Sequence, residues 1–205
     1  MTTNRVFSIG IAAGALALLT ACSGGSEHDM STMSSSAPAA SQASSAPTAT
    51  ESSSAAFNDA DVMFAQMMIP HHQQAVEMAE MAETRASDKE VKELAAKIKA
   101  AQDPEIQTMQ GWLKTWGKPA PSGGMGHNMP GIMSEADMKK LEAAKGAAFD
   151  KQFVQLMTAH HNGAIEMART EQSQGSNPEA KALAKTIETA QQTEVEQMQG
   201  LLKRL

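Results

Sequence analysis

The chain contains an ungapped internal repeat. Residues 61–113 match residues 150–202 at a constant offset of 89, with 23 identities in 53 aligned positions. A match of this length without a gap indicates a duplicated structural unit. In both copies, apolar residues recur at helical spacing on either side of a turn-forming segment, at 86–88 in copy one and 175–178 in copy two. Each copy is therefore predicted to be a helical hairpin.

Two hairpins predict an all-α protein, a four-helix bundle over residues 57–205. The composition agrees, because aromatic residues make up only 3% of the chain and there is no tyrosine, which is poor material for a sheet. Ser87 or Asp88 is placed to cap the second helix of copy one, and Asn177 with Pro178 does the same in copy two.

The segment between the copies is predicted to be a connector followed by a short extra helix. Residues 117–133 are rich in Met, Gly and Pro, and Ser134-x-x-Asp137 resembles a capping box. Pro104 lies within the second helical pattern of copy one. It predicts a kink, or a helix restart capped by Asp103.

The N-terminus predicts export and lipid anchoring. Arg5 precedes an apolar run over residues 6–19, too short to span a membrane, and Leu-Thr-Ala-Cys at 19–22 resembles a bacterial lipobox. Residues 1–21 are thus predicted to be a signal peptide, and Cys22, the single cysteine, the site of lipid (palmitate-type) attachment. The alternative is an ordinary cleaved signal that leaves a free thiol.

Residues 22–56 are mostly Ser, Ala, Pro and Thr and predict a disordered tether between the membrane and the folded domain. The expected location is therefore the outer side of the cell membrane. The net charge of −6 and the lack of any basic run exclude nucleic acid as a partner.

The identities between the copies concentrate on one face of the first helix. With about 100° between successive residues, that face is centred on Met68 and carries both histidines of the adjacent pair His71 and His72. Both imidazoles are therefore predicted to point inward. The inward residues of chemical interest are Asp61, Met68, His71, His72 and Met78 in copy one, and Asp150, Met157, His160, His161 and Met167 in copy two.

The second helix of each hairpin adds a carboxylate to the interior. Glu105 lies on the inner stripe of copy one beside Gln102, and we expect both to stand opposite Met68 to His71. Glu194 and Gln191 are their counterparts in copy two. A carboxylate that faces the core is costly unless it is paired or metal-bound.

Imidazole and thioether together predict a transition-metal site. Thioether sulfur favours Cu(I), and imidazole binds Cu(I), Cu(II), Zn or Ni, so a copper ion, Cu(I) first, is the expected cofactor. The predicted ligands are Met68, His71, His72, Met78, Met157, His160, His161 and Met167. Possible additional ligands or supporting residues are Asp61, Gln102, Glu105, Asp150, Gln191, Glu194, Met125, His127, Met129 and Met133.

Two other functions stay open. Methionine at helical spacing is often a core filler, and a histidine on an apolar face is often a hydrogen-bonded core residue. The histidine pairs would then be structural and the protein a cell-surface binding or scaffold module. A ferritin-like di-metal oxidase is the third candidate, but neither hairpin carries Glu-x-x-His, and no nucleophile elbow or phosphate loop occurs. We expect no enzyme activity.

Three motifs resemble a known family. F-x-x-x-M-x-x-H-H-x-x-A-x-x-M-A begins at Phe64 and again at Phe153, Q-x-x-E-I-x-x-M-x-x-W-L begins at Gln102, and M-P-G-I-M-S begins at Met129. Together they resemble the bacterial "domain of unknown function 305" family over about residues 58–205. Copy two departs from the pattern at Leu156, which replaces the methionine of copy one.

The resemblance implies a ferritin-like four-helix bundle that is secreted or membrane-anchored, with copper binding and copper tolerance in some members. Carried over position by position, it implies the same eight His and Met ligands. The expected function is sequestration or transfer of copper outside the cytoplasm, with an unidentified metal-handling protein as a possible partner.

Overall fold

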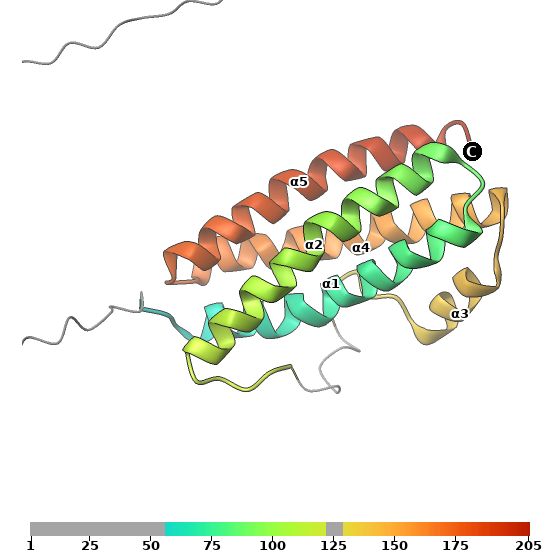
Figure 1. Cartoon of the computed structure of the whole chain (residues 1–205). Helices are drawn as coiled ribbons and strands as arrows, with labels where there is room; N and C mark the ends of the chain where they lie inside the picture. Colours follow the sequence, from blue (N-terminus) through green and yellow to red (C-terminus); the bar gives the residue numbers. More distant parts are fainter. Residues whose placement is uncertain (1–55, 122–128) are drawn as a thin grey trace, which may run out of the picture. The chain divides into compact units, whose positions relative to one another are not determined.

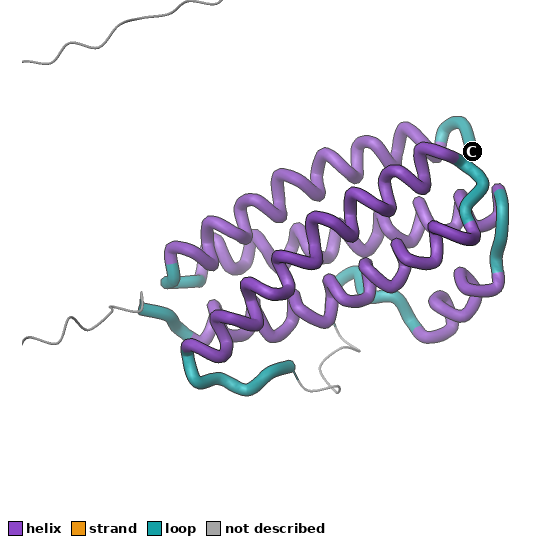
Figure 2. Tube along the Cα trace, viewed as in Figure 1, coloured by secondary structure: helices purple, strands orange, loops and turns teal. Residues whose placement is uncertain are grey.

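The computed structural model describes residues 56–121 and 129–205, and its long helices form two hairpins (Figure 1). No strand occurs among these residues (Figure 2). The helices are α1 (Asp59–Arg85), α2 (Lys89–Thr115), α3 (Glu135–Ala143), α4 (Ala147–Gln174) and α5 (Pro178–Leu202). The prediction of an all-α bundle made of two duplicated hairpins and a short extra helix is confirmed.

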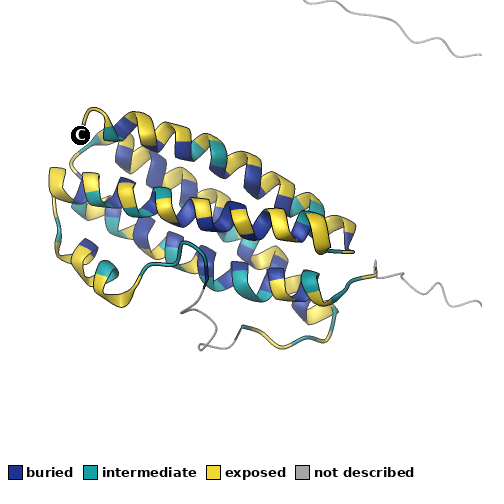
Figure 3. Cartoon of the chain, turned by 180° about the vertical axis from the view of Figure 1, so that it is seen from behind, coloured by how far each residue is buried: buried dark blue, intermediate teal, exposed yellow. Residues whose placement is uncertain are grey.

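The two hairpins meet chiefly through their first helices. α1 packs on α2 and α4 packs on α5, whereas between the hairpins α1 contacts α4 far more extensively than α2 contacts α5. α1 and α4 run in opposite directions beside one another (Figure 1). Buried residues follow the inward face of each long helix and exposed residues the outward face (Figure 3).

The predicted helix starts are confirmed. The Asp88 side chain accepts hydrogen bonds from the first turn of α2, the Asn177 side chain does the same for α5, and the Ser134 side chain accepts from the Asp137 N–H at the start of α3. Each cap supplies an acceptor for N–H groups that have no partner inside the helix.

The helix restart considered at Pro104 is wrong. α2 continues through Pro104, and α1 likewise continues through Pro70. Asp103 instead forms an ion pair with Lys99 at 3.4 Å. Proline removes one helical hydrogen bond and costs about 3 kcal/mol in an isolated helix, but packing of α2 along its whole length opposes that cost.

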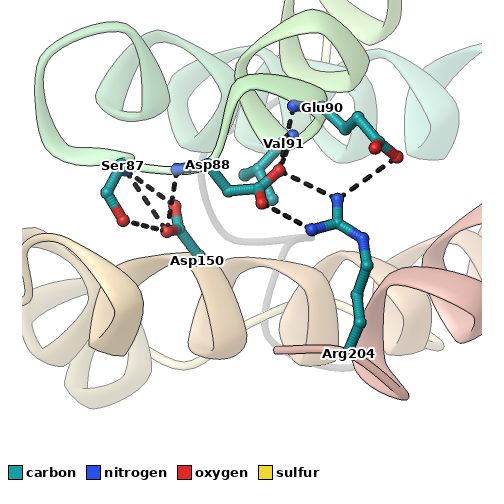
Figure 4. Close-up of polar contacts among 6 residues, drawn as sticks. All are labelled: Ser87, Asp88, Glu90, Val91, Asp150 and Arg204. Atoms are coloured by element: carbon teal, nitrogen blue, oxygen red, sulfur yellow. Dashed lines mark hydrogen bonds and ion pairs between the residues drawn. The ribbon is translucent and has the colours of Figure 1, made fainter.

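Each hairpin holds the turn of the other through one buried aspartate. Asp150 of α4 accepts hydrogen bonds from the Ser87 N–H (3.0 Å), the Asp88 N–H (3.0 Å) and the Ser87 hydroxyl (Figure 4). Asp61 of α1 accepts from the N–H groups of Ser176 (3.1 Å) and Asn177 (2.9 Å). The reciprocal pairing follows the internal repeat and fixes how the hairpins dock.

The C-terminal end joins the same turn. Arg204 donates to both Asp88 carboxylate oxygens, at 2.6 and 3.0 Å, and lies 3.2 Å from Glu90 (Figure 4). The hydrogen bonds from Arg204 lower the pKa of Asp88 to about 2.

Several predictions lie outside the described residues: the signal peptide (1–21), Cys22, the tether apart from its last residue, and Met125 and His127. Among the residues that are described, no helix is long and apolar enough to cross a membrane.

Candidate metal centre

A polar layer crosses the middle of the bundle. One apolar cluster fills the end of the bundle that holds the 86–88 turn, and a second fills the opposite end. The histidine pairs lie between them, and all four side chains are completely inaccessible to solvent: His71, His72, His160 and His161. The prediction that both members of each pair point inward is confirmed.

One histidine of each pair is bound to a carboxylate from the neighbouring helix of its own hairpin. His72 Nε2 lies 2.8 Å from Glu105 Oε2, and His161 Nε2 lies 2.7 Å from Glu194 Oε2. The inward carboxylates were predicted, although Glu105 meets His72 rather than the Met68 to His71 stretch. Both carboxylates keep some contact with solvent, at 16% and 19% exposure, which lowers the cost of burying them.

The other histidine of each pair crosses between the hairpins. The rings of His71 and His160 lie against each other, with centroids 3.8 Å apart and planes tilted by 40°. His71 Nε2 is 3.0 Å from the Pro130 carbonyl oxygen of the connector. A carbonyl oxygen can only accept, so this ring nitrogen carries the proton and Nδ1 keeps a free lone pair.

Burial keeps these two rings neutral. Burial, with the neighbouring His72, lowers the pKa of His71 to about 3. Burial, followed by the proximity of His71, lowers the pKa of His160 well below its ordinary value. Neutral imidazole is the form that binds metal ions.

The layer holds several buried polar atoms without a hydrogen-bond partner. They are Nδ1 of all four histidines, Nε2 of His160, both amide atoms of Gln102 and Oε1 of Gln191. Each such atom costs about 1–3 kcal/mol. Metal-binding histidines typically donate one ring N–H to a carboxylate or carbonyl and coordinate through the other nitrogen. Three of the four histidines show that pattern, so the residues fit a metal ion.

The predicted methionine ligands divide between the two ends rather than between the two copies. Met68 and Met167 belong to the cluster at one end, whereas Met78 and Met157 belong to the cluster at the other. The antiparallel docking of α1 on α4 causes this exchange. Within the described residues, no three His, Cys, Asp or Glu side chains are arranged to hold a metal ion. A site here therefore needs thioether donors or a small movement of the rings.

Other candidates occupy different places. Asp61 and Asp150 are engaged with the hairpin turns, as described above. Met129 and Met133 lie in the connector, where Met133 exchanges backbone hydrogen bonds with the Gln74 side chain at 2.7 and 3.0 Å.

Close packing of the connector on α4 was not predicted. A Cβ atom on Gly163 would lie 2.0 Å from the Pro130 oxygen, and one on Gly131, whose φ is +76°, would lie 2.7 Å from the Ala159 oxygen. The sequence contained one indication of this close packing, because Gln74 of copy one corresponds to a glycine, Gly163, in copy two. This approach brings the Pro130 carbonyl to His71.

Glu171 was also not predicted, because it is not among the residues that the two copies share. It is 1% exposed, faces Asp61, and replaces Ala82 of copy one. Burial, with Asp61 nearby, raises its pKa to about 8. Gly175 makes room for it, because a Cβ there would lie 2.1 Å from Glu171 Oε1.

Comparison with known proteins agrees with this architecture. The family model described as Domain of unknown function (DUF305) matches residues 61–202, which span both repeats. The chain belongs to this family. A DUF305 protein from Streptomyces coelicolor is 37% identical, with a TM-score of 0.67, and the match covers 71% of this chain and 93% of that one. A DUF305 fragment from Deinococcus radiodurans is 31% identical, with the same TM-score over 72% and 98%.

The structures of CopM are also similar to this DUF305 chain. The Cu(I)-bound form is 34% identical with a TM-score of 0.61, and the Cu(II)-bound form is 34% identical with a TM-score of 0.63. Each covers 70% of this chain and 96% of CopM. No curated protein matches the chain.

Proposed function

We propose that this protein binds copper outside the cytoplasm and sequesters it or passes it on, without catalysis. The observation that carries the proposal is the set of four fully buried imidazoles whose Nδ1 atoms have no partner. A purely structural histidine in a core satisfies its polar atoms, because each unpaired one is costly.

The supporting contacts have the character expected around a metal. Glu105 accepts a hydrogen bond from His72, and Glu194 accepts one from His161. Each carboxylate orients the imidazole ring and makes its Nδ1 lone pair a stronger ligand for a metal ion. Met68, Met78, Met157 and Met167 border the layer and would supply soft sulfur ligands. Thioethers need no deprotonation, so they bind Cu(I) over a wide pH range. CopM, at 33–34% identity, has been crystallised with Cu(I), Cu(II) and silver.

Competition for Cu(I) against a chromophoric chelator tests the proposal. Wild-type protein should take up Cu(I), and the variant with His71, His72, His160 and His161 replaced by alanine should lose most of this uptake. Glu166→Gln is the matched control, because Glu166 is exposed on α4 and contacts none of the histidines. Unchanged uptake by the four-histidine variant would show that the layer is not the site.

Metal analysis of untagged protein separates the alternatives. Bound copper supports the proposal. A scaffold would carry background metal, and the four-histidine variant would only melt at a lower temperature. A di-metal oxidase would carry iron or manganese and consume oxygen.

We also propose that the protein is a lipoprotein anchored through Cys22 on the outer side of the cell membrane. The lipobox-like residues 19–22 and the Ser, Ala and Pro segment after them support this location. Cys22→Ser should move the protein from the membrane fraction to the soluble fraction and abolish labelling by palmitate. If the variant stayed in the membrane fraction and was still labelled by palmitate, anchoring at Cys22 would be contradicted.

A further inference from the structure

A second group of methionines lines a pocket on the outer side of α1. The pocket has a volume of about 760 Å³ and lies between α1, the connector and α3. Its four thioethers come from three separate segments of the chain: Met81 of α1, Met129 and Met133 of the connector, and Met138 of α3. Met81 and Met138 carry no motif in the sequence, so only the fold brings them to the connector.

This pocket is distinct from the histidine layer. The α1 residues that line it are Pro70, Gln74, Glu77 and Met81, and Glu77 is exposed on the face of α1 opposite Met68. None of the four histidines lines it. A cation held here would therefore be a separate ion.

The two connector methionines are held in place before any ligand arrives. The Gln74 amide accepts from the Met133 N–H at 2.7 Å and donates to the Met133 carbonyl at 3.0 Å, which fixes this backbone on α1. Met129 is 5% exposed, and the next residue, Pro130, accepts from His71. Ser134 then caps α3, the helix that carries Met138. Preorganised donors lower the entropic cost of binding.

The charges on the lining favour a cation. The ionisable lining residues are three carboxylates, Glu77, Glu135 and Glu142, and one ammonium, Lys139. Lys139 lies 3.9 Å from Glu135, and Arg85 lies 3.9 Å from Glu142, so the carboxylates outnumber the cations by one. Carboxylates around a cleft raise the local concentration of cations. The thioethers inside then select a soft ion over Mg²⁺ or Ca²⁺, which prefer oxygen ligands.

Packing alone accounts for part of this arrangement, because Met81, Met133 and Met138 also contact the apolar cluster at this end of the bundle. A packing role does not require four sulfur-bearing side chains around an open, negatively charged pocket. We propose that the pocket formed by Met81, Met129, Met133 and Met138 binds one soft monovalent cation, Cu(I) or Ag(I), through thioether sulfur, independently of the histidine layer.

Silver titration of the purified protein tests the pocket, with Ag(I) as a probe that does not change oxidation state under these conditions. In protein labelled with [methyl-¹³C]methionine, Ag(I) should shift the methyl signals of all four methionines, in wild type and in the four-histidine variant alike. Replacing the four methionines with leucine, which conserves volume, should lower the bound Ag(I) by one equivalent. The matched control replaces Met63 and Met67, which line a different groove on α1, with leucine and should leave the four signals responsive.

The proposal would be refuted if the methyl signals of wild type did not shift. It would also be refuted if the leucine variant bound as many Ag(I) ions per chain as wild type. The signals in wild type are read without any substitution, so a misfolded variant does not decide the result. If the histidine variant binds no Ag(I), the pocket is refuted while the proposed histidine site stands. If only the leucine variant loses an ion, the pocket stands and the histidine site is refuted.

Discussion

Glu171→Gln should make this protein more stable at pH 8. Glu171 is 1% exposed, faces Asp61, and lies in the last turn of α4, where the helix dipole also disfavours a negative charge. Neither of its carboxylate oxygens accepts a hydrogen bond from any donor among the described residues. Two facing carboxyl groups can hydrogen-bond only when one carries a proton, so the folded state holds Glu171 protonated.

The sign and the magnitude follow from the raised pKa. An unfolded glutamate titrates near 4.5, whereas folded Glu171 titrates at about 8. Between these values the folded state binds a proton that the unfolded state has lost, so stability falls as the pH rises from about 4.5 to about 8. At about 1.4 kcal/mol per pH unit, the loss by pH 7 is about 3 kcal/mol, reduced where Asp61 shares the proton.

The amide that replaces the Glu171 carboxyl group in the variant is neutral at every pH and can still donate to Asp61. We expect wild type and variant to melt at similar temperatures at pH 5, and the variant to melt about 4–10 °C higher at pH 8, for a gain of about 2–3 kcal/mol. Calorimetry across this range measures both. Glu166→Gln, an exposed change on the same helix, controls for net charge. Parallel pH profiles for variant and wild type would refute the buried proton.

Three further sets of substitutions test the described contacts. The double variant Glu105→Gln, Glu194→Gln should weaken Cu(I) binding about 10–100-fold in chelator competition, because the carboxylates bound to His72 and His161 lose their charge. An affinity within about twofold of wild type would show that these carboxylates do not support metal binding. Asp150→Ala should lower the free energy of unfolding in urea by about 3–4 kcal/mol, because charge-assisted hydrogen bonds to Ser87 and Asp88 are lost; Asp61→Ala should act similarly, and a loss under about 1 kcal/mol would contradict the clamp. Gly163→Ala should lower the free energy of unfolding by about 2–4 kcal/mol, because the added methyl group pushes Pro130 off α4. Gly111→Ala should be neutral or stabilising, because a Cβ there meets nothing within 4 Å. Equal urea midpoints for these two variants would contradict the close approach of Pro130 to Gly163.

Much of the candidate centre was predictable because it depends on single helices. The helical wheel places His71 and His72 inward whatever α1 packs against, and the same holds for Glu105 on α2. A hairpin with a known turn then sets those two faces opposite each other. Glu105 contacts His72 rather than the predicted stretch that ends at His71. This difference of one residue depends on how far each helix is rotated about its own axis in the bundle, which a helical wheel does not give.

The contacts between the hairpins were not predictable in this way. The His71–His160 ring contact, the exchange of methionines between the two ends and the crossed use of Asp61 and Asp150 all depend on α1 and α4 docking antiparallel. Glu171 and Gly175 replace Ala82 and Ala86 as a compensating pair, which is visible only once the side chains are placed.

Local sequence was enough to set the number of helices, their caps, their turns and the inward direction of the histidines. These features rest on interactions between residues a few positions apart and on the ungapped repetition of the unit. Only the packed bundle decided which histidines meet, where the connector lies and which methionines share a pocket. Those outcomes depend on the packing of surfaces far apart in the chain, where a single close approach, such as Pro130 on Gly163, selects one arrangement.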